Sequence, residues 1–248
     1  MALQLPLQFE FNTQQTFSNY YPGPNLEVVS HLKSALTEGR EQLIFLWGAS
    51  GVGKTHLLHA SCHQAHLTQH STFIFSLQAG QLPPLRILEN LEESDWVCID
   101  NIDCIAGNAD WELAFFNFFN RHRDLDKHLV LTANTPPNFL TVDLPDLKTR
   151  LNWGLTLKLE SLTDEDSLAA LQMKAKTLGL AIKPHVGKYL LTHFARDLPS
   201  LWRLLDDLDS ATLAAKRKLT LPFLRQLLQA DPDNTDSKSN PNAPTNFD

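Results

Sequence analysis

Short apolar runs alternate with stretches of helical periodicity along the first two thirds of the chain. The runs cover residues 43–47, 73–75, 96–99, 129–131 and 155–159, and only the last shows much polar alternation. Continuous apolar runs are typical of strands buried on both faces of a parallel sheet. Helical patterns lie between them, as at 55–70 and 110–122. The pattern predicts an α/β fold, a parallel five-stranded sheet flanked by helices.

The strand-like runs stop after Glu160, and the periodicity becomes helical. Thr163 and Asp166 have the spacing of a capping box, and Gly179 is typical of a helix end. Leucines at helical spacing predict a longer helix over 197–217. We expect a small all-helical lid domain over residues 161–230, packed on the α/β core.

The two ends of the chain differ in composition from the rest. Residues 231–248 contain no aliphatic run and are rich in Asn, Asp, Ser and Pro, which predicts a disordered polar tail. Residues 1–16 form an N-terminal arm that is mostly polar, apart from the compact segment 4–9. The α/β domain is therefore expected over residues 17–160.

Composition limits the class of function. The 248 residues carry 21 Lys and Arg against 28 Asp and Glu, so the net charge is -7. This balance counts against direct binding of duplex DNA, which needs a basic surface. The three cysteines have neither disulfide-framework nor zinc spacing. The chain lacks a long apolar run and a charged N-terminal leader, so we expect a cytoplasmic protein without a membrane segment.

The segment from Gly48 to Thr55 fits the phosphate-binding pattern G-x-x-x-x-G-K-[ST]. Glycines allow a tight turn that directs backbone N–H groups at phosphate oxygens. Lys54 supplies a charge for the β- and γ-phosphates, and Thr55 supplies a hydroxyl for Mg²⁺. The nucleotide-binding residues predicted here are Gly48, Ser50, Gly51, Val52, Gly53, Lys54 and Thr55.

Asp100 ends the apolar run 96–99, as the Walker B acid does in P-loop proteins. We expect it to hold Mg²⁺ together with Thr55. Hydrolytic AAA+ ATPases usually have an acid at the next position, which here is Asn101. An amide can hold a water molecule but cannot accept its proton. The chain is therefore predicted to bind nucleotide and to hydrolyse it slowly by itself.

Three further polar residues have two interpretations each. Asn134 follows an apolar run, where either a γ-phosphate sensor or a simple turn residue would stand. Arg150 is either an arginine finger that acts across a subunit boundary or a surface arginine in a salt bridge. Arg196 either reaches back to the nucleotide from the lid or is an exposed charge at a helix end. Spacing alone does not decide between them.

Together the motifs resemble the DnaA family of AAA+ P-loop ATPases. Segments 16–23, 150–154 and 196–198 and both Walker motifs follow in the order of that family. Segments 98–102 and 218–223 are more similar to members that regulate the initiator DnaA than to the initiator, which keeps an acid at the position of Asn101. The resemblance covers about residues 4–229.

The resemblance implies a negative regulator of replication initiation. Arg150 would act in trans and prompt hydrolysis of the ATP that DnaA holds, while Arg196 would be the lid sensor. ADP, or ATP, with Mg²⁺ is the ligand implied. Asn134 departs from the acid expected at its position, so the resemblance assigns it no role.

The segment Gln4-Leu5-Pro6-Leu7-Gln8-Phe9 resembles the peptide by which replication proteins bind the sliding clamp, the β subunit of DNA polymerase III. Gln4 would make polar anchoring contacts, while Leu5, Leu7 and Phe9 would fill an apolar groove. Pro6 would lower the entropy lost on binding. The other interpretation is an arm packed on the core.

Two other functions are weighed against this one. A stand-alone AAA+ ATPase or helicase loader would show substantial turnover, which Asn101 disfavours. A truncated, initiator-like DNA-binding protein is disfavoured by the net charge and by the lack of a helix-turn-helix domain after Gln229. Contact with DNA would then be made through the clamp. Whether copies form a homo-oligomer is left open by the sequence.

Overall fold

The computed structural model describes residues 15–193, 198–215, 222 and 224. The predicted clamp-binding residues Gln4, Leu5, Leu7 and Phe9 lie outside the described residues. So do the predicted lid sensor Arg196 and the tail 231–248. Among the described helices, none combines the length and the apolar character needed to cross a membrane.

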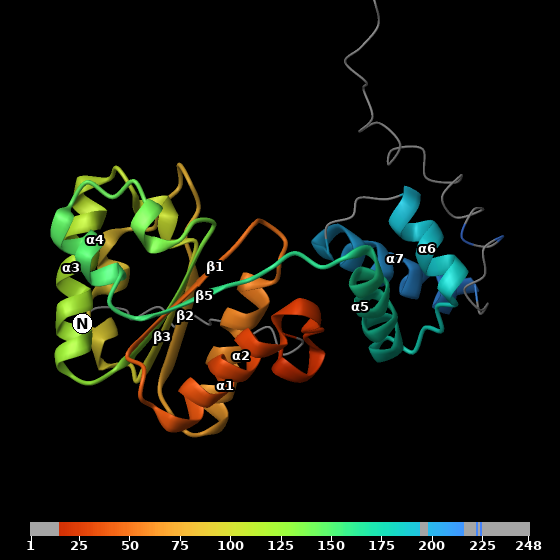
Figure 1. The fold of residues 1–248 in the computed structure, drawn as a ribbon, viewed down its shortest axis with the longest axis horizontal. Coiled ribbons are helices and arrows are strands. Elements are labelled where there is room, and N and C mark those ends of the chain that lie inside the picture. Colours follow the sequence, from red (N-terminus) through yellow and green to blue (C-terminus); the bar gives the residue numbers. More distant parts are fainter. Residues whose placement is uncertain (1–14, 194–197, 216–221, 223, 225–248) are drawn as a thin grey trace, which may run out of the picture.

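Five parallel strands form one sheet (Figure 1), and their order is β2-β3-β4-β1-β5. Their bounds are β1 (Leu43–Trp47), β2 (Thr72–Ser76), β3 (Trp96–Asp100), β4 (His128–Ala133) and β5 (Leu155–Lys158). This confirms the predicted five-stranded parallel sheet. Because every strand runs the same way, all carboxyl ends meet at one edge and all amino ends at the other.

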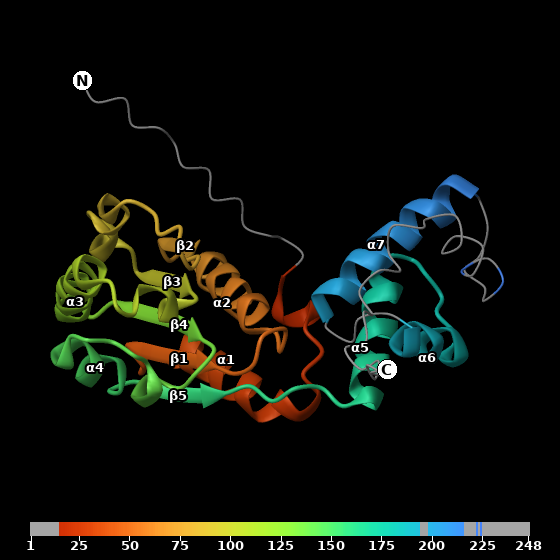
Figure 2. The ribbon, with the colours of Figure 1, turned by 90° about the horizontal axis from the view of Figure 1, so that it is seen from above.

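Helices cover both faces of the sheet, as the strand–helix alternation predicts (Figure 2). One face carries α1 (Leu26–Glu38) and α2 (Lys54–Leu67), and the other carries α3 (Ala109–Asp124) and α4 (Pro145–Leu151). Successive β1 side chains enter opposite cores, since Ile44 packs with the first pair of helices and Phe45 with the second. Two buried faces explain why the run is apolar at every position.

Short 3₁₀ turns connect these elements. They are η1 (Phe17–Asn19), η2 (Gly23–Asn25), η3 (Leu85–Leu88), η4 (Leu91–Glu93), η5 (Ile102–Ile105) and η6 (Pro137–Phe139). Of these, η1 and η2 precede α1, and η5 follows the Walker B strand directly.

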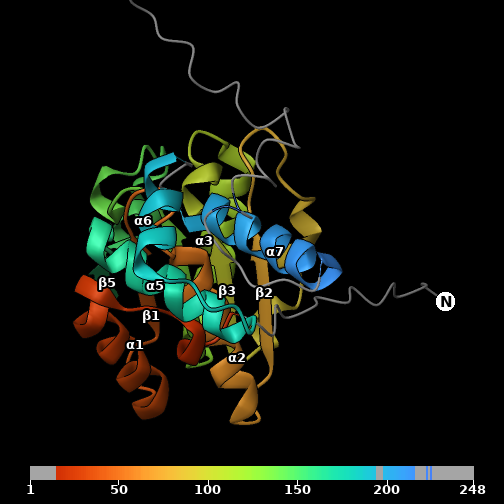
Figure 3. The same cartoon turned by 90° about the vertical axis from the view of Figure 1, so that its right-hand side faces the viewer.

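The helical domain contains α5 (Asp164–Thr177), α6 (Pro184–His193) and α7 (Leu198–Ala215), which pack around a core of their own (Figure 3). The predicted capping box is present: Thr163 Oγ1 accepts from the Asp166 N–H at 3.1 Å, and the Asp166 carboxylate accepts from the Thr163 N–H at 3.4 Å. The strand arrows point toward this domain, so the carboxyl edge of the sheet faces it (Figure 2).

Candidate nucleotide-binding site

The predicted phosphate loop connects the carboxyl end of β1 to the first turn of α2. Gly48, Ser50, Gly51 and Val52 lie in the loop, and Gly53 is the N-cap of α2, with φ +100°. A Cβ at Gly53 would stand 2.7 Å from the Tyr20 ring. Only glycine fits both the backbone conformation and this close contact. The N-terminal segment thereby closes the loop from outside.

Lys54 is buried at the start of α2 and points into the loop. Its ammonium donates to the Gly48 carbonyl at 2.8 Å, the Ala49 carbonyl at 2.9 Å and Asn134 Oδ1 at 3.1 Å. Burial lowers the pKa of Lys54, and the charges of Asp100 and Asp103 oppose that shift. The loop therefore holds a cation beside a helix N-terminus, an arrangement suited to phosphate groups.

Thr55 and Asp100 meet across the first turn of α2 and the end of β3. The Thr55 hydroxyl donates to Asp100 Oδ2 at 2.7 Å, and the Thr132 hydroxyl from β4 donates to Asp100 Oδ1. Asp100 is 3% exposed. A hydroxyl and a carboxylate beside a phosphate loop fit the oxygen ligands that Mg²⁺ prefers. Thr132 was not predicted, because an apolar strand context gives no sign of a functional hydroxyl.

Asn134 lies just beyond β4, between the loop lysine and a second carboxylate. Its Oδ1 accepts from Lys54, and its Nδ2 donates to Asp103 Oδ2 at 2.8 Å. Asp103 is not among the site residues predicted from the sequence, and it stands three positions beyond Asp100. The η5 turn brings its carboxylate back to the site.

The Asn101 side chain is turned away from the phosphate loop. Asn101 has φ +59°, and its Nδ2 donates to the Leu77 carbonyl beyond β2 at 3.3 Å. Its backbone N–H donates to the Thr132 hydroxyl at 3.0 Å. The side-chain amide of Asn101 therefore bonds to the backbone that directly follows β2. Asp103, and not Asn101, is the residue after the Walker B acid that contacts the Asn134 side chain.

Arg150 lies at the opposite edge of the sheet from the phosphate loop. It stands in the last turn of α4, and β5 begins at Leu155 beside Ile44 of β1. The phosphate loop instead follows Trp47 at the other end of β1. A five-residue strand spans roughly 16 Å. Arg150 is therefore far from the chain's own phosphate site and borders another surface.

A buried carboxylate fixes the start of α4. Glu112, 1% exposed on α3, accepts from the backbone N–H groups of Gly107 at 2.8 Å, Asp143 at 2.9 Å and Leu144 at 2.7 Å. Leu144 is the N-cap of α4. Glu112 thus joins the loop after η5 to the helix that carries Arg150.

The N-terminal segment supplies contacts that the sequence did not reveal. The Tyr20 hydroxyl donates to the Val52 carbonyl at 3.4 Å, and burial raises the pKa of Tyr20 to about 12. Asn25 bonds both backbone groups of Glu160, with its Nδ2 2.9 Å from the carbonyl and its Oδ1 2.7 Å from the N–H. The Tyr21 hydroxyl donates to Asp166 on α5 at 3.2 Å. The N-terminal segment therefore contacts both the phosphate loop and the connection between β5 and α5.

Two sequence family models match the chain. The model described as the bacterial DnaA ATPase domain matches residues 11–158, and the model described as Hda, lid domain, matches residues 164–228. Together the two models cover most of the α/β domain and most of the helical domain. The first alone spans more than half of the sequence.

Solved structures with the same fold include replication proteins. Domain III of the Thermotoga maritima replication initiation protein DnaA has a TM-score of 0.74 at 20% identity, over 88% of this chain and 97% of that one. AMPPCP-bound DnaA from Aquifex aeolicus has a TM-score of 0.66 at 24% identity, over 77% and 63%. The Thermotoga maritima RuvB Holliday junction branch migration motor has a TM-score of 0.66 at 18% identity, over 92% and 76%. At these identities the likeness concerns the fold.

Proposed function

Because the chain belongs to the DnaA family of AAA+ proteins, we propose that it is a negative regulator of replication initiation. Residues 4–9 bind the sliding clamp on DNA, and Arg150 approaches ATP held by the initiator DnaA. The arginine speeds hydrolysis of that ATP and so inactivates the initiator. The partners are the clamp and DnaA, with no sequence-specific contact to DNA by the chain itself.

The position of Arg150 carries this proposal. Its guanidinium lies at the sheet edge opposite the chain's own phosphate loop, which supports a role toward a nucleotide held by another molecule. An arginine brought to a transferring phosphoryl group stabilises the charge that develops in the transition state. Such fingers raise turnover by roughly 10³–10⁵-fold. Within the described ranges Arg150 forms no ion pair, which supports the finger interpretation over the salt-bridge one.

The chain's own site is proposed to hold ADP, or ATP, with Mg²⁺. Lys54 and the loop backbone bind the phosphates, Thr55 and Asp100 hold the metal, and Asn134 orients Lys54. Bound Mg²⁺ neutralises phosphate charge. Arg196 of the lid is proposed to complete the site. With Asn101 turned away, we expect slow hydrolysis by the chain alone.

The test measures ATP hydrolysis by purified DnaA in the presence of DNA-loaded clamp. Wild-type chain is expected to accelerate it, Arg150→Ala to abolish the acceleration, and Lys148→Ala, on the same helix, to keep it within about twofold. Arg150→Ala should still bind ADP like the wild type. If the wild type leaves the DnaA rate unchanged, the proposed function is wrong.

The clamp contact has its own test. Gln4→Ala combined with Leu5→Ala is expected to abolish binding to the clamp in a pull-down titration and to leave nucleotide affinity unchanged. Gln14→Ala combined with Gln15→Ala, later in the same segment, is the matched control. Clamp affinity equal to wild type in the Gln4/Leu5 variant would refute this part of the proposal.

A stand-alone ATPase is the second candidate, and the position of Asp103 favours it. Its carboxylate reaches Asn134 beside Lys54, where it could accept a proton from an attacking water in place of Asn101. This function predicts rapid turnover without any partner, lost in Asp103→Asn. Turnover far below one per second in both the wild type and Asp103→Asn would rule out the stand-alone ATPase.

A further inference from the structure

The indole of Trp153 lies against the guanidinium of Arg150 at the amino edge of the sheet. Arg150 Cζ is 3.8 Å from the ring centroid, and Cζ of Arg123, from α3, is 5.4 Å from it. We propose that Trp153 is a positioning residue that holds the Arg150 guanidinium oriented for a phosphoryl group on the neighbouring molecule. This inference rests on the proposed function and specifies how the finger is prepared.

The chemistry of the contact suits an arginine that must stay available. An aromatic face attracts a guanidinium through the ring quadrupole and uses none of its N–H donors. A carboxylate would occupy those donors and neutralise the charge. Within the described part of the chain, the Arg150 side chain has neither a carboxylate partner nor a hydrogen-bond acceptor. Its donors are therefore free to bind phosphate oxygens.

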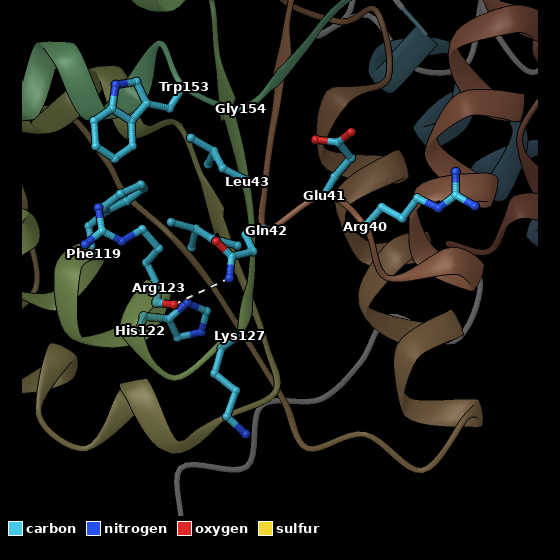
Figure 4. Close-up of a pocket in the computed structure, with 11 residues that line it drawn as sticks. Arg40, Glu41, Gln42, Leu43, Phe119, His122, Arg123, Lys127, Trp153 and Gly154 are labelled. Atoms are coloured by element: carbon cyan, nitrogen blue, oxygen red, sulfur yellow. Dashed lines mark hydrogen bonds between the residues drawn. The ribbon is translucent and has the colours of Figure 1, made fainter.

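Trp153 is itself fixed from the sheet side. A Cβ at Gly154 would collide with the backbone carbonyl of Leu43, so this backbone lies directly on the start of β1. Beneath the indole is a cavity of about 280 Å³, lined by Leu43, Phe119 and Arg123 among others (Figure 4). The backbone N–H of Trp153 donates to the backbone carbonyl of Arg150 at 3.1 Å, and this bond closes the turn between the two residues.

The indole is not simply a core side chain. Trp153 is 55% exposed, whereas Trp96 is buried within the core that α1 and α2 share with the sheet. A large exposed ring contributes little to the core, yet it presents one face to a cation. The combination of an exposed ring, a stacked arginine and a rigid glycine anchor is what a positioned surface arginine requires.

The test measures DnaA ATP hydrolysis with DNA-loaded clamp against the concentration of this chain, which separates maximal rate from half-saturating concentration. Trp153→Leu removes the ring and should lower the maximal rate about three- to tenfold, the loss expected when a flexible side chain is no longer held in place. Its half-saturating concentration should stay unchanged. Trp153→Phe keeps an aromatic face and should restore most of the rate. Leu125→Ser, which removes another exposed apolar side chain at this edge, should behave like the wild type.

The outcomes separate the two proposals. If Arg150→Ala abolishes stimulation while Trp153→Leu keeps the full maximal rate, only the positioning role is overturned. A changed half-saturating concentration with an unchanged maximal rate would make Trp153 a docking residue, which also overturns it. If Arg150→Ala stimulates as well as wild type, the proposed function itself fails. Equal ADP affinity in all variants shows that each is folded. Should Trp153→Leu not fold, Trp153→Gln, which also removes the aromatic face, decides the question by the same split between maximal rate and half-saturating concentration.

Discussion

We predict that His122 makes the stability of the α/β domain depend on pH. It lies near the end of α3 at 2% exposure, beside the cavity under Trp153 (Figure 4). Burial lowers its pKa to about 4, a hydrogen bond with the Ser94 backbone opposes the shift, and the charges of His128 and Lys127 add to it. Within the described residues its Nε2 has no hydrogen-bond partner.

The sign follows from proton binding in the two states. In the unfolded chain the imidazole takes up a proton near pH 6.5, but in the folded protein only near pH 4. Between these values the unfolded state binds more protons, so stability falls as the pH falls. One pKa unit corresponds to about 1.4 kcal/mol. The free energy of unfolding should therefore be lower by about 3 kcal/mol at pH 4 than at pH 7, and it should change very little above pH 7.

The measurement is the free energy of unfolding by urea at pH 7, 6, 5 and 4, for wild type and His122→Gln. The variant lacks the titrating ring. Between pH 7 and pH 4 the free energy of unfolding of the wild type should therefore fall by about 3 kcal/mol more than that of the variant. Burial also lowers the pKa of His56 and of His59, but both remain in the two proteins and cancel in the comparison. His31→Gln, at a 58% exposed side chain, is the control and should follow the wild type. Parallel curves for wild type and His122→Gln would refute the reasoning.

Three further predictions concern the site and its supports. Glu112→Ala leaves three backbone N–H groups without their acceptor, so the free energy of urea unfolding should drop by about 2–4 kcal/mol, with a smaller drop for Glu112→Gln; a loss below about 0.5 kcal/mol would contradict this. Lys54→Ala should abolish binding of a fluorescent ADP analogue while Lys148→Ala binds normally, and wild-type affinity in Lys54→Ala would contradict the site. Asn25→Ala removes both bonds to Glu160 and should speed proteolysis of the segment between the two domains, whereas an unchanged cleavage rate would show that Asn25 does not fix it.

The features that sequence reasoning predicts well depend on neighbours along the chain. The strands follow from short apolar runs, the phosphate loop from glycine spacing between a strand and a helix, and the α5 cap from the Thr163 and Asp166 pair. In each case the residues that make the structure stand within a few positions of one another. A one-dimensional pattern is then enough.

Contacts between distant segments could not be predicted in this way. Asn25 and Glu160 stand 135 positions apart, and nothing local in either segment indicates the other. The Asp103–Asn134 pair arises because two strand ends meet at one edge and η5 turns the chain back. For Arg150, spacing left a finger and a salt bridge open. The stacked indole and the opposite sheet edge favour the first.

The polarity of the parallel sheet determines what kind of contact the proposed finger can make. The phosphate loop lies at the carboxyl edge and Arg150 at the amino edge, so no rotation of one chain upon itself brings them together. A DnaA-type partner must present its own carboxyl edge to this chain's amino edge, which is a heterologous, head-to-tail contact. Such a contact leaves this chain's nucleotide site outside that interface. Nucleotide binding here and hydrolysis on the partner should therefore be separable by mutation, with Lys54 affecting the first directly and Arg150 affecting only the second.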